Sequence, residues 1–290
     1  MFYFSLFRGI LFVEYNLIKT LNFIMLMTMT LEKSKQYIQN KIKEKPDFGI
    51  LLLGNQFDRL IEEIKNPICI SYEEIPLFSK KNLYGKFIFG KIEDKNVVLL
   101  IEPFSEENRT NNFSIVLCKN IGIDKFILIN ISGGVNPNYK MGDVMLVKDH
   151  INFFPESSNI KEFIKNRFFE ITEPYDKKMI EIAENIAMNH NIIIQKGVYV
   201  AYPYSNYKTY AEYAMIRSMG GDSVGIDIVS DVIKARCMNL RVFAISIIMG
   251  LYKKSDEHRN SNFKPFFYKE IEKSISLLIL IVKEFIKLCL

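Results

Sequence analysis

The chain has 290 residues, with 38 lysines and arginines against 33 aspartates and glutamates, a net charge of +5, and 49% hydrophobic residues. This composition predicts a globular protein with a sizeable core and excludes a disordered or collagen-like chain. No block of five or six like charges is present, so the sequence lacks the pattern of a surface that binds the phosphates of a nucleic acid. We therefore expect no nucleic-acid partner.

The cysteines and histidines lie far apart in sequence, at Cys69, Cys118, Cys237, Cys289, His150, His190 and His258. They form no C-x-x-C pair and show none of the spacings that metal ligands need. The sequence therefore predicts neither a metal site nor a disulfide framework. A reduced, cytoplasmic location is expected on the same ground.

The N-terminal segment 1–30 is apolar and aromatic, but three charges divide it into pieces shorter than the roughly 20 residues that cross a bilayer: Arg8, Glu14 and Lys19. The segment also shows no distinct basic start, compact apolar stretch or small-residue cleavage site of the kind that a signal peptide has. Three methionines between Met25 and Met29 indicate a translation start within this segment. We interpret residues 1–30 as an extension in preference to a membrane anchor, expect no membrane partner, and place the folded domain at 31–290.

From Asp47 onward, apolar runs of strand length alternate with helical patterns, as is typical of an α/β domain with a largely parallel sheet. In the first half, the patterns predict strands over 48–53, 85–93, 97–102 and 125–131, and helices over 56–65 and 112–120. The turn at 94–96 joins the second and third strands as a hairpin. The fourth strand ends at Ser132-Gly133-Gly134.

In the second half, the patterns predict strands over 144–147, 192–200, 223–226 and 241–248, and helices over 174–189, 209–219, 229–238 and 265–288. Thr209 and Glu212 have the spacing of a capping box. Residues 223–248 follow in β-α-β order. The expected fold class is α/β, with one domain whose mixed, largely parallel central sheet is flanked by helices.

The common loops that bind nucleotides or activate a serine are absent, because the sequence contains no G-x-G-x-x-G after its first strand, no P-loop and no G-x-S-x-G. The remaining candidate is the strand end 129–134. Two glycines there let backbone N–H groups approach an anion or a sugar closely. A simple tight turn explains the same pair of glycines.

Several longer blocks closely resemble the trimeric purine nucleoside phosphorylases in order and spacing: 122–137, 142–152, Gly197-Val-Tyr199-Val, Thr209-x-Ala211-Glu212, 221–225 and 240–243. The resemblance covers nearly all of residues 48–290. It implies the nucleoside phosphorylase fold and a homotrimer. It also implies cleavage of inosine or guanosine with phosphate as co-substrate, without a metal or an organic cofactor.

The resemblance assigns to the cleft a set of residues that keep the family's chemistry: Asn130, Ile131, Ser132, Gly133, Gly134, Tyr199, Tyr207 and Ile226. Asn130 is the catalytic candidate among them, and Ile226 takes the place of a methionine that packs against the ribose. Phe168 matches the aromatic residue that covers a neighbouring subunit's ribose. Asp143, His150 and Asn152 are intact too, and we expect them to be structural.

Other positions depart from the family pattern. Lys208 stands where a glutamate reads the purine, and a lysine cannot accept those hydrogen bonds. Gly250 replaces the asparagine that contacts the purine's imidazole ring, and Leu83 replaces a phosphate-side histidine. A phosphate-binding serine becomes Asp227, whose charge repels an anion by about 4 kcal/mol at 4 Å and an effective dielectric of 20.

The phosphate loop after the first strand reads Gly54-Asn55-Gln56, so Asn55 takes the place of its serine, and the family's arginine is lost. Arg109 lies close enough in sequence to substitute for it. Three hypotheses remain open: a phosphorylase with a rearranged site, a non-catalytic protein that keeps the scaffold and the trimer surface, and a nucleoside hydrolase with Asp227 or Asp58 as general base.

Overall fold

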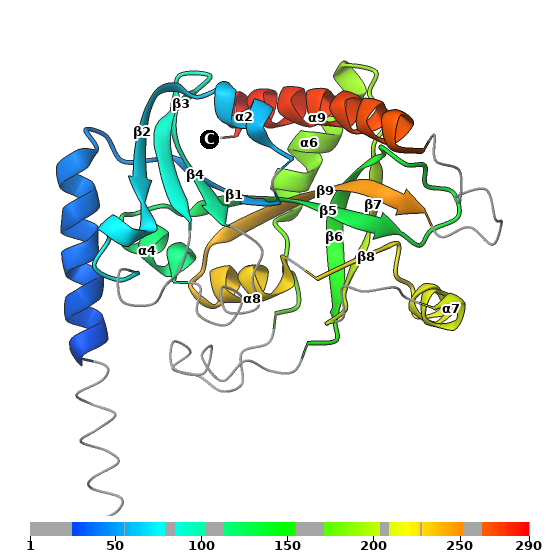
Figure 1. Cartoon of the computed structure of the whole chain (residues 1–290), viewed down its shortest axis with the longest axis horizontal. Helices are drawn as coiled ribbons and strands as arrows, with labels where there is room; N and C mark the ends of the chain where they lie inside the picture. Colours follow the sequence, from blue (N-terminus) through cyan, green and yellow to red (C-terminus); the bar gives the residue numbers. More distant parts are fainter. Residues whose placement is uncertain are drawn as a thin grey trace, which may run out of the picture.

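Within the described residues, nine strands pair in one mixed sheet (Figure 1). The computed structural model describes residues 25–54, 56–78, 85–102, 113–154, 171–203, 209–226, 228–251 and 263–289, and only the backbone of 251 and 263–269. The strands are β1 Phe48–Leu53, β2 Lys65–Ser71, β3 Lys86–Ile92, β4 Lys95–Glu102, β5 Lys125–Gly134, β6 Val144–Asn152, β7 Gln195–Ala201, β8 Ser223–Gly225 and β9 Arg241–Leu251.

The sheet has an open half and a closed half. In the open half, β1 lies between its parallel neighbours β4 and β5, and β2 and β3 extend the sheet in antiparallel order beyond β4. In the closed half, β5 pairs with β8, β8 with β7, β7 with β6, β6 with β9 and β9 with β5. The chain therefore encloses a small five-stranded barrel at one end of the sheet.

The centre of the sheet is apolar on both faces. The side chains of Phe48, Ile50, Leu51 and Leu52 in β1 are at most 1% exposed, and the run 126–129 in β5 is fully buried. Such uninterrupted apolar strands are typical of parallel strands that helices cover on both sides. This hydrophobic burial is the main stabilising contribution to the fold.

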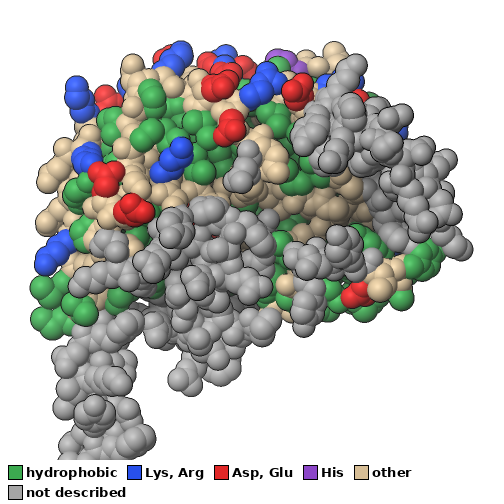
Figure 2. All heavy atoms as spheres, in the orientation of Figure 1, with side chains coloured by type: hydrophobic (Ala, Val, Ile, Leu, Met, Phe, Trp, Pro, Cys, Tyr) green, Lys and Arg blue, Asp and Glu red, His purple; other side chains and the backbone are tan. Residues whose placement is uncertain are grey.

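Helices cover both faces of the sheet: α2 Asp58–Glu62, α4 Ser114–Asn120, α6 Lys177–Asn189, α7 Tyr210–Ser218, α8 Val229–Cys237, α9 Phe263–Leu288 and the short 3₁₀ turn η1 Tyr72–Glu74. Figure 1 shows α6 and α9 on one face, α4 and α8 on the other, and α7 outside the barrel. Charged side chains concentrate over the α9 side in Figure 2.

Local sequence signals determine where two of these helices begin. The Asp176 carboxylate accepts a hydrogen bond from the Met179 amide at 3.0 Å and caps α6. The capping box at the start of α7 is confirmed, because Thr209 and Glu212 bond reciprocally to each other's backbone. Both arrangements satisfy N–H groups that a helix cannot satisfy internally.

The predicted fold class is confirmed, and most predicted strands and helices lie within a few residues of their expected bounds. The helix predicted over 56–65 is shorter, because Lys65 already belongs to β2, a strand that the sequence analysis did not predict. The predicted β-α-β order of 223–248 is confirmed as β8, α8 and β9, but β8 runs antiparallel to β5 and does not pair with β9.

An additional helix covers residues 25–41 and lies beside β2 (Figure 1). It crosses the domain boundary expected at residue 31, and Met27 and Leu31 both pack against the core. Its Ile38 side chain is fully buried. None of the helices in the described part of the chain is long and apolar enough to span a membrane.

Candidate active site

The candidate site lies where three neighbouring parallel strands, β4, β1 and β5, end. Glu102 at the end of β4 pairs in register with Leu53 of β1. On the other side of β1, Leu52 pairs with Ile129, and Asn130 follows directly. Neighbouring strands are about 4.8 Å apart, so the backbones of Glu102 and Asn130 are about 10 Å apart. In open α/β sheets, ligands bind at such carboxyl ends.

At the β5 end, the polar side chains form a buried network without charge. The Asn130 amide donates a hydrogen bond to the Tyr199 hydroxyl at 3.0 Å, and both side chains are fully buried. The Ser132 and Ser246 hydroxyls lie 2.6 Å apart. The sequence analysis predicted Asn130, Ser132 and Tyr199 for the cleft, and the fold brings all three into the barrel.

One acceptor of this network has no partner in the described part of the chain. The Asn130 Oδ1 atom is buried and accepts no hydrogen bond. Leaving such an atom unsatisfied costs about 1–3 kcal/mol, so native structures keep few of them. This atom is therefore a candidate contact for a ligand.

Gly133 and Gly134 lie inside β5 and pair with Val224 and Ser223 of β8. Neither glycine has a positive φ, so the tight-turn explanation of this pair is wrong. Gly250 of β9 lies in register beside Gly133, and a Cβ atom built at residue 250 meets none of the described residues within 4 Å. Ile226 is half-buried directly after β8, and Ile131 is half-buried in β5.

At the β4 end, three ionisable side chains are buried together. Glu102 is 6% exposed, and its Oε1 accepts a hydrogen bond from the Tyr72 hydroxyl at 2.6 Å. Asp231 of α8 is also 6% exposed, and the Lys234 ammonium lies 3.5 Å from its Oδ1. The sequence analysis missed this trio of Glu102, Asp231 and Lys234. Glu102 ends an apolar run, but its burial depends on helices that are distant in sequence.

Within the trio, the pKa of the Glu102 carboxyl is raised, and burial is the largest cause. This pKa is about 7 instead of 4.5, because burial and, after it, the negative charge of Asp231 raise it. Hydrogen bonds from Ser114 and Tyr72 and the charge of Lys234 act in the opposite direction. Glu102 therefore exchanges a proton near neutral pH, which marks this end of the edge as chemically distinct.

The backbone that leads into α8 is strained. Ile228 has a φ of 58° and is fully buried, and no side chain caps the helix that begins at Val229. A β-branched residue in the left-handed region is a genuine outlier. Such strain clusters at functional sites.

Several predicted site residues lie outside the described ranges: Asn55, Leu83, Arg109, Phe168, Tyr207, Lys208 and Asp227. Their places in the cleft stay predictions. Four of the undescribed segments that contain them border one of these described residues: Gly54, Glu102, Thr209 or Ile228. Asp58, the second candidate base, is exposed at the start of α2.

The intact scaffold residues all find partners. Asp143 accepts hydrogen bonds from the Lys140 amide and the Gln195 side chain, and the Asn152 side chain accepts one from the Phe154 amide. His150 Nδ1 lies 3.2 Å from the Tyr175 hydroxyl, and burial lowers the pKa of this histidine. These contacts agree with a structural role.

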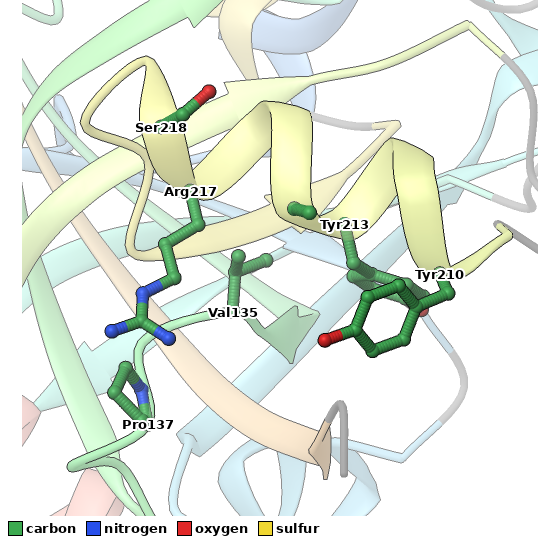
Figure 3. A pocket seen from close by; sticks show the side chains of 7 residues that line it. Val135, Pro137, Tyr210, Tyr213, Arg217 and Ser218 are labelled. Carbon is green, nitrogen blue, oxygen red and sulfur yellow. The ribbon is translucent and has the colours of Figure 1, made fainter. Parts of the chain in front are cut away.

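A separate pocket of about 450 Å³ lies between α7 and the turn that follows β5. Figure 3 shows Arg217 beside Pro137 at one side, Tyr210 at the other and Val135 between them. Tyr210, Met215 and Met219 are also exposed on this helix. The pocket contains none of the residues predicted for the cleft.

The described residues contain no group of three or more histidine, cysteine or acidic side chains arranged to hold a metal ion. The four cysteines are free.

Comparison with known proteins identifies the class to which this fold and cleft belong. Residues 50–287 match the family described as the phosphorylase superfamily. The chain resembles the structure of Schistosoma mansoni purine nucleoside phosphorylase in complex with adenosine, with a TM-score of 0.77, 25% identity, and coverage of 90% of this chain and 97% of that chain. The same enzyme in complex with inosine gives a TM-score of 0.77, with the same identity and coverage.

Proteins that are similar in sequence identify the family within this superfamily. Purine nucleoside phosphorylase 1 of Bacillus subtilis is 35% identical over 230 residues, which are 75% of this chain and 84% of that protein. The purine nucleoside phosphorylase of Rattus norvegicus is 28% identical over 234 residues, 75% of this chain and 80% of that protein. The chain belongs to the purine nucleoside phosphorylase family.

Proposed function

We propose that this protein binds a purine nucleoside in the cleft beside β5 and cleaves its N-glycosidic bond with phosphate, more slowly than its relatives. The observation that carries the proposal is the neutral network of Asn130 and Tyr199, with its orphaned Asn130 Oδ1 at the strand exits. Relatives named purine nucleoside phosphorylase, and solved relatives bound to adenosine and inosine, support a purine nucleoside as substrate.

The slow rate follows from the groups that differ. An enzyme of this kind must stabilise the charge that develops on the departing purine, and each missing donor costs about 10²- to 10³-fold in rate. Gly250 supplies no side chain at the purine, and Lys208 offers a donor where an acceptor is expected. Arg109 and Asn55 are the proposed phosphate contacts, and Phe168 is the proposed contact across a homotrimer.

The substitution Gly250→Asn tests the proposal, because it restores the family's side chain at a position where a Cβ atom meets none of the described residues within 4 Å. We expect kcat/KM for inosine phosphorolysis to rise by about 10-fold or more. Gly220→Asn adds the same side chain after the end of α7 and is the control for activity; its Cβ also meets none of the described residues within 4 Å, but its φ of 91° strains an asparagine, so its stability is measured as well. Absence of hypoxanthine release from both the wild type and Gly250→Asn would refute phosphorolysis.

A non-catalytic binding protein is the second candidate. The buried trio of Glu102, Asp231 and Lys234 at the exit of β4 favours it. Isothermal titration of the full chain with inosine, guanosine, hypoxanthine and phosphate separates the two. Purine binding without turnover indicates a binding protein, and turnover to the free base without phosphate indicates the nucleoside hydrolase. Light scattering at micromolar concentration tests the homotrimer, and a monomer would contradict it.

A further inference from the structure

The Asp222 carboxylate joins the exit of β5 to β7, directly before β8 begins. Its Oδ1 accepts a hydrogen bond from the Asn136 side-chain amide at 2.7 Å, and its Oδ2 accepts one from the Val198 amide at 2.8 Å. Asn136 lies two residues after Gly134, and Val198 directly precedes Tyr199. The carboxylate thus contacts the chain next to two residues predicted for the cleft.

The backbone of Asp222 makes the same connection a second time. Its carbonyl accepts hydrogen bonds from the Val135 and Asn136 amides at 2.9 and 3.0 Å, and its amide donates one to the Val198 carbonyl at 2.9 Å. Residue 222 therefore uses its amide, its carbonyl and both carboxylate oxygens to hold the β5 exit against β7.

β7 admits this carboxylate because residue 197 is a glycine. A Cβ atom there would lie 2.7 Å from Asp222 Cβ, 2.9 Å from Asp222 Oδ2 and 2.5 Å from the Tyr139 hydroxyl. All three distances are shorter than the 3.4 Å at which ordinary van der Waals contact begins. Three blocks of the sequence that resemble the family, 122–137, 197–200 and 221–225, therefore meet at Asp222.

Strand pairing connects Asp222 to the neutral network of the cleft. Gly134 pairs with Ser223, the residue after Asp222, and Ser223 pairs with Tyr199 on its other side. The Tyr199 hydroxyl in turn accepts a hydrogen bond from Asn130. Loss of a contact of the carboxylate would therefore let the end of β5 shift relative to Tyr199.

We propose that Asp222 is a positioning residue for the cleft: it fixes the end of β5 relative to Tyr199, and it acts on a bound purine nucleoside only through these two parts. This inference rests on the proposed function, because it assigns Asp222 a role in binding and cleaving the nucleoside. A displacement of about 1 Å that originates far from the reacting atoms can cost roughly 100-fold in rate.

Exchanging the side chains of residues 136 and 222 tests whether hydrogen bonds carry this role. In Asp222→Asn, the new NH₂ group faces either the Asn136 amide or the Val198 N–H, so one hydrogen bond is lost. In Asn136→Asp, two carboxylates replace a hydrogen-bonded pair and repel each other.

The double variant Asp222→Asn/Asn136→Asp restores the pair with its direction reversed. Residue 222 then donates to residue 136 and still accepts from the Val198 amide. Residue 136 still accepts from the Asn138 amide, as it does in the wild type at 3.0 Å. The net charge of the protein is unchanged.

Inosine affinity and kcat/KM for inosine phosphorolysis should fall by about 10- to 100-fold in each single variant and recover in the double variant. Both are measured where urea unfolding shows each variant to be fully folded, so a purely structural role would leave them unchanged. Gly197→Ala displaces the carboxylate without changing its chemistry, should cause the same loss, and serves if the single variants are unstable. Asn138→Asp adds a carboxylate at an exposed position of the same turn and should behave as wild type.

Amide hydrogen exchange over residues 130–137 detects the displacement without a substrate. It should be roughly 10-fold faster in the single variants than in the wild type, and near the wild-type rate in the double variant. Unchanged inosine affinity and kcat/KM in the folded single variants and in Gly197→Ala would overturn the inference. A double variant as impaired as the single variants would do so as well.

Failure of the proposed function has a different signature. A wild type that neither binds inosine nor releases hypoxanthine would refute the purine nucleoside as substrate. Exchange that is faster in the single variants and restored in the double variant would then still show that Asp222 positions the end of β5.

Discussion

The two ends of the strand edge solve the burial of polar groups in different ways. At β5, Asn130, Ser132 and Tyr199 are neutral and bond mainly to one another. At β4, the ionisable side chains of Glu102, Asp231 and Lys234 are buried, and burial is the main reason that the pKa of the Glu102 carboxyl is about 7. At the neutral end Asn130, Ser132 and Tyr199 match the family pattern, whereas Gly250, in register beside Gly133, departs from it.

Lys234→Met should break the charged end most severely. The Lys234 ammonium lies 3.5 Å from the buried Asp231 carboxylate, and removing one partner of a buried ion pair costs about 3–5 kcal/mol at pH 8. The loss should be smaller at pH 5.5, where a carboxyl takes up a proton. Urea unfolding at both pH values measures the difference. Lys177→Met removes an exposed lysine and should change stability little.

The pH dependence of the free energy of unfolding should distinguish the charged end of the strand edge from the neutral end. Because the folded pKa of Glu102 is raised from 4.5 to about 7, its contribution to stability is complete below 4.5 and is lost as pH rises to 7. The loss amounts to about 3 kcal/mol at most. Glu102→Gln should therefore unfold at a higher urea concentration than wild type at pH 8, and at a similar one at pH 4.5. The opposite order at pH 8 would contradict the raised pKa.

Gly225→Ala tests the packing of the neutral end. A Cβ atom there would clash with the Tyr199 hydroxyl, so the tyrosine must shift, and its hydrogen bond with Asn130 would be disturbed. Overpacking of this kind costs about 1–3 kcal/mol. Gly133→Ala is the matched control, since its Cβ would meet Val224 at an ordinary 3.6 Å. Equal thermal stability of the two variants would show that Tyr199 is not tightly held.

Tyr199→Phe should have the smallest effect. It removes the hydroxyl that accepts a hydrogen bond from Asn130 and leaves that amide donor unsatisfied, at about 1–2 kcal/mol. Tyr37→Phe, which removes an exposed hydroxyl bonded to Glu74, is the control and should leave stability nearly unchanged. If the purine site depends on this network, inosine affinity should fall in Tyr199→Phe only.

Local patterns predicted the elements well where a single stretch of sequence decides them. The apolar run of β1 and the reciprocal caps of Thr209 and Glu212 depend on neighbours in sequence, and both are confirmed. The strand β2 was missed because Asn66 and Pro67 interrupt its pattern, and its pairing with β3 supplies what the local sequence lacks. Residues 148–152 were missed as strand because pairing with β7 extends β6 through them.

The sequence by itself determined the α/β class, the family and the retained polar residues of the cleft, because these depend on periodicity, spacing and residue identity. Only the tertiary structure decided that β5 to β9 close into a barrel, that Gly133 is a strand residue beside Gly250, and that Glu102 meets Asp231 and Lys234. Gly133 and Gly250, and Glu102 and Asp231, are more than 100 positions apart in sequence. Whether a carboxyl group is buried or exposed depends on such contacts, and that burial determines its charge.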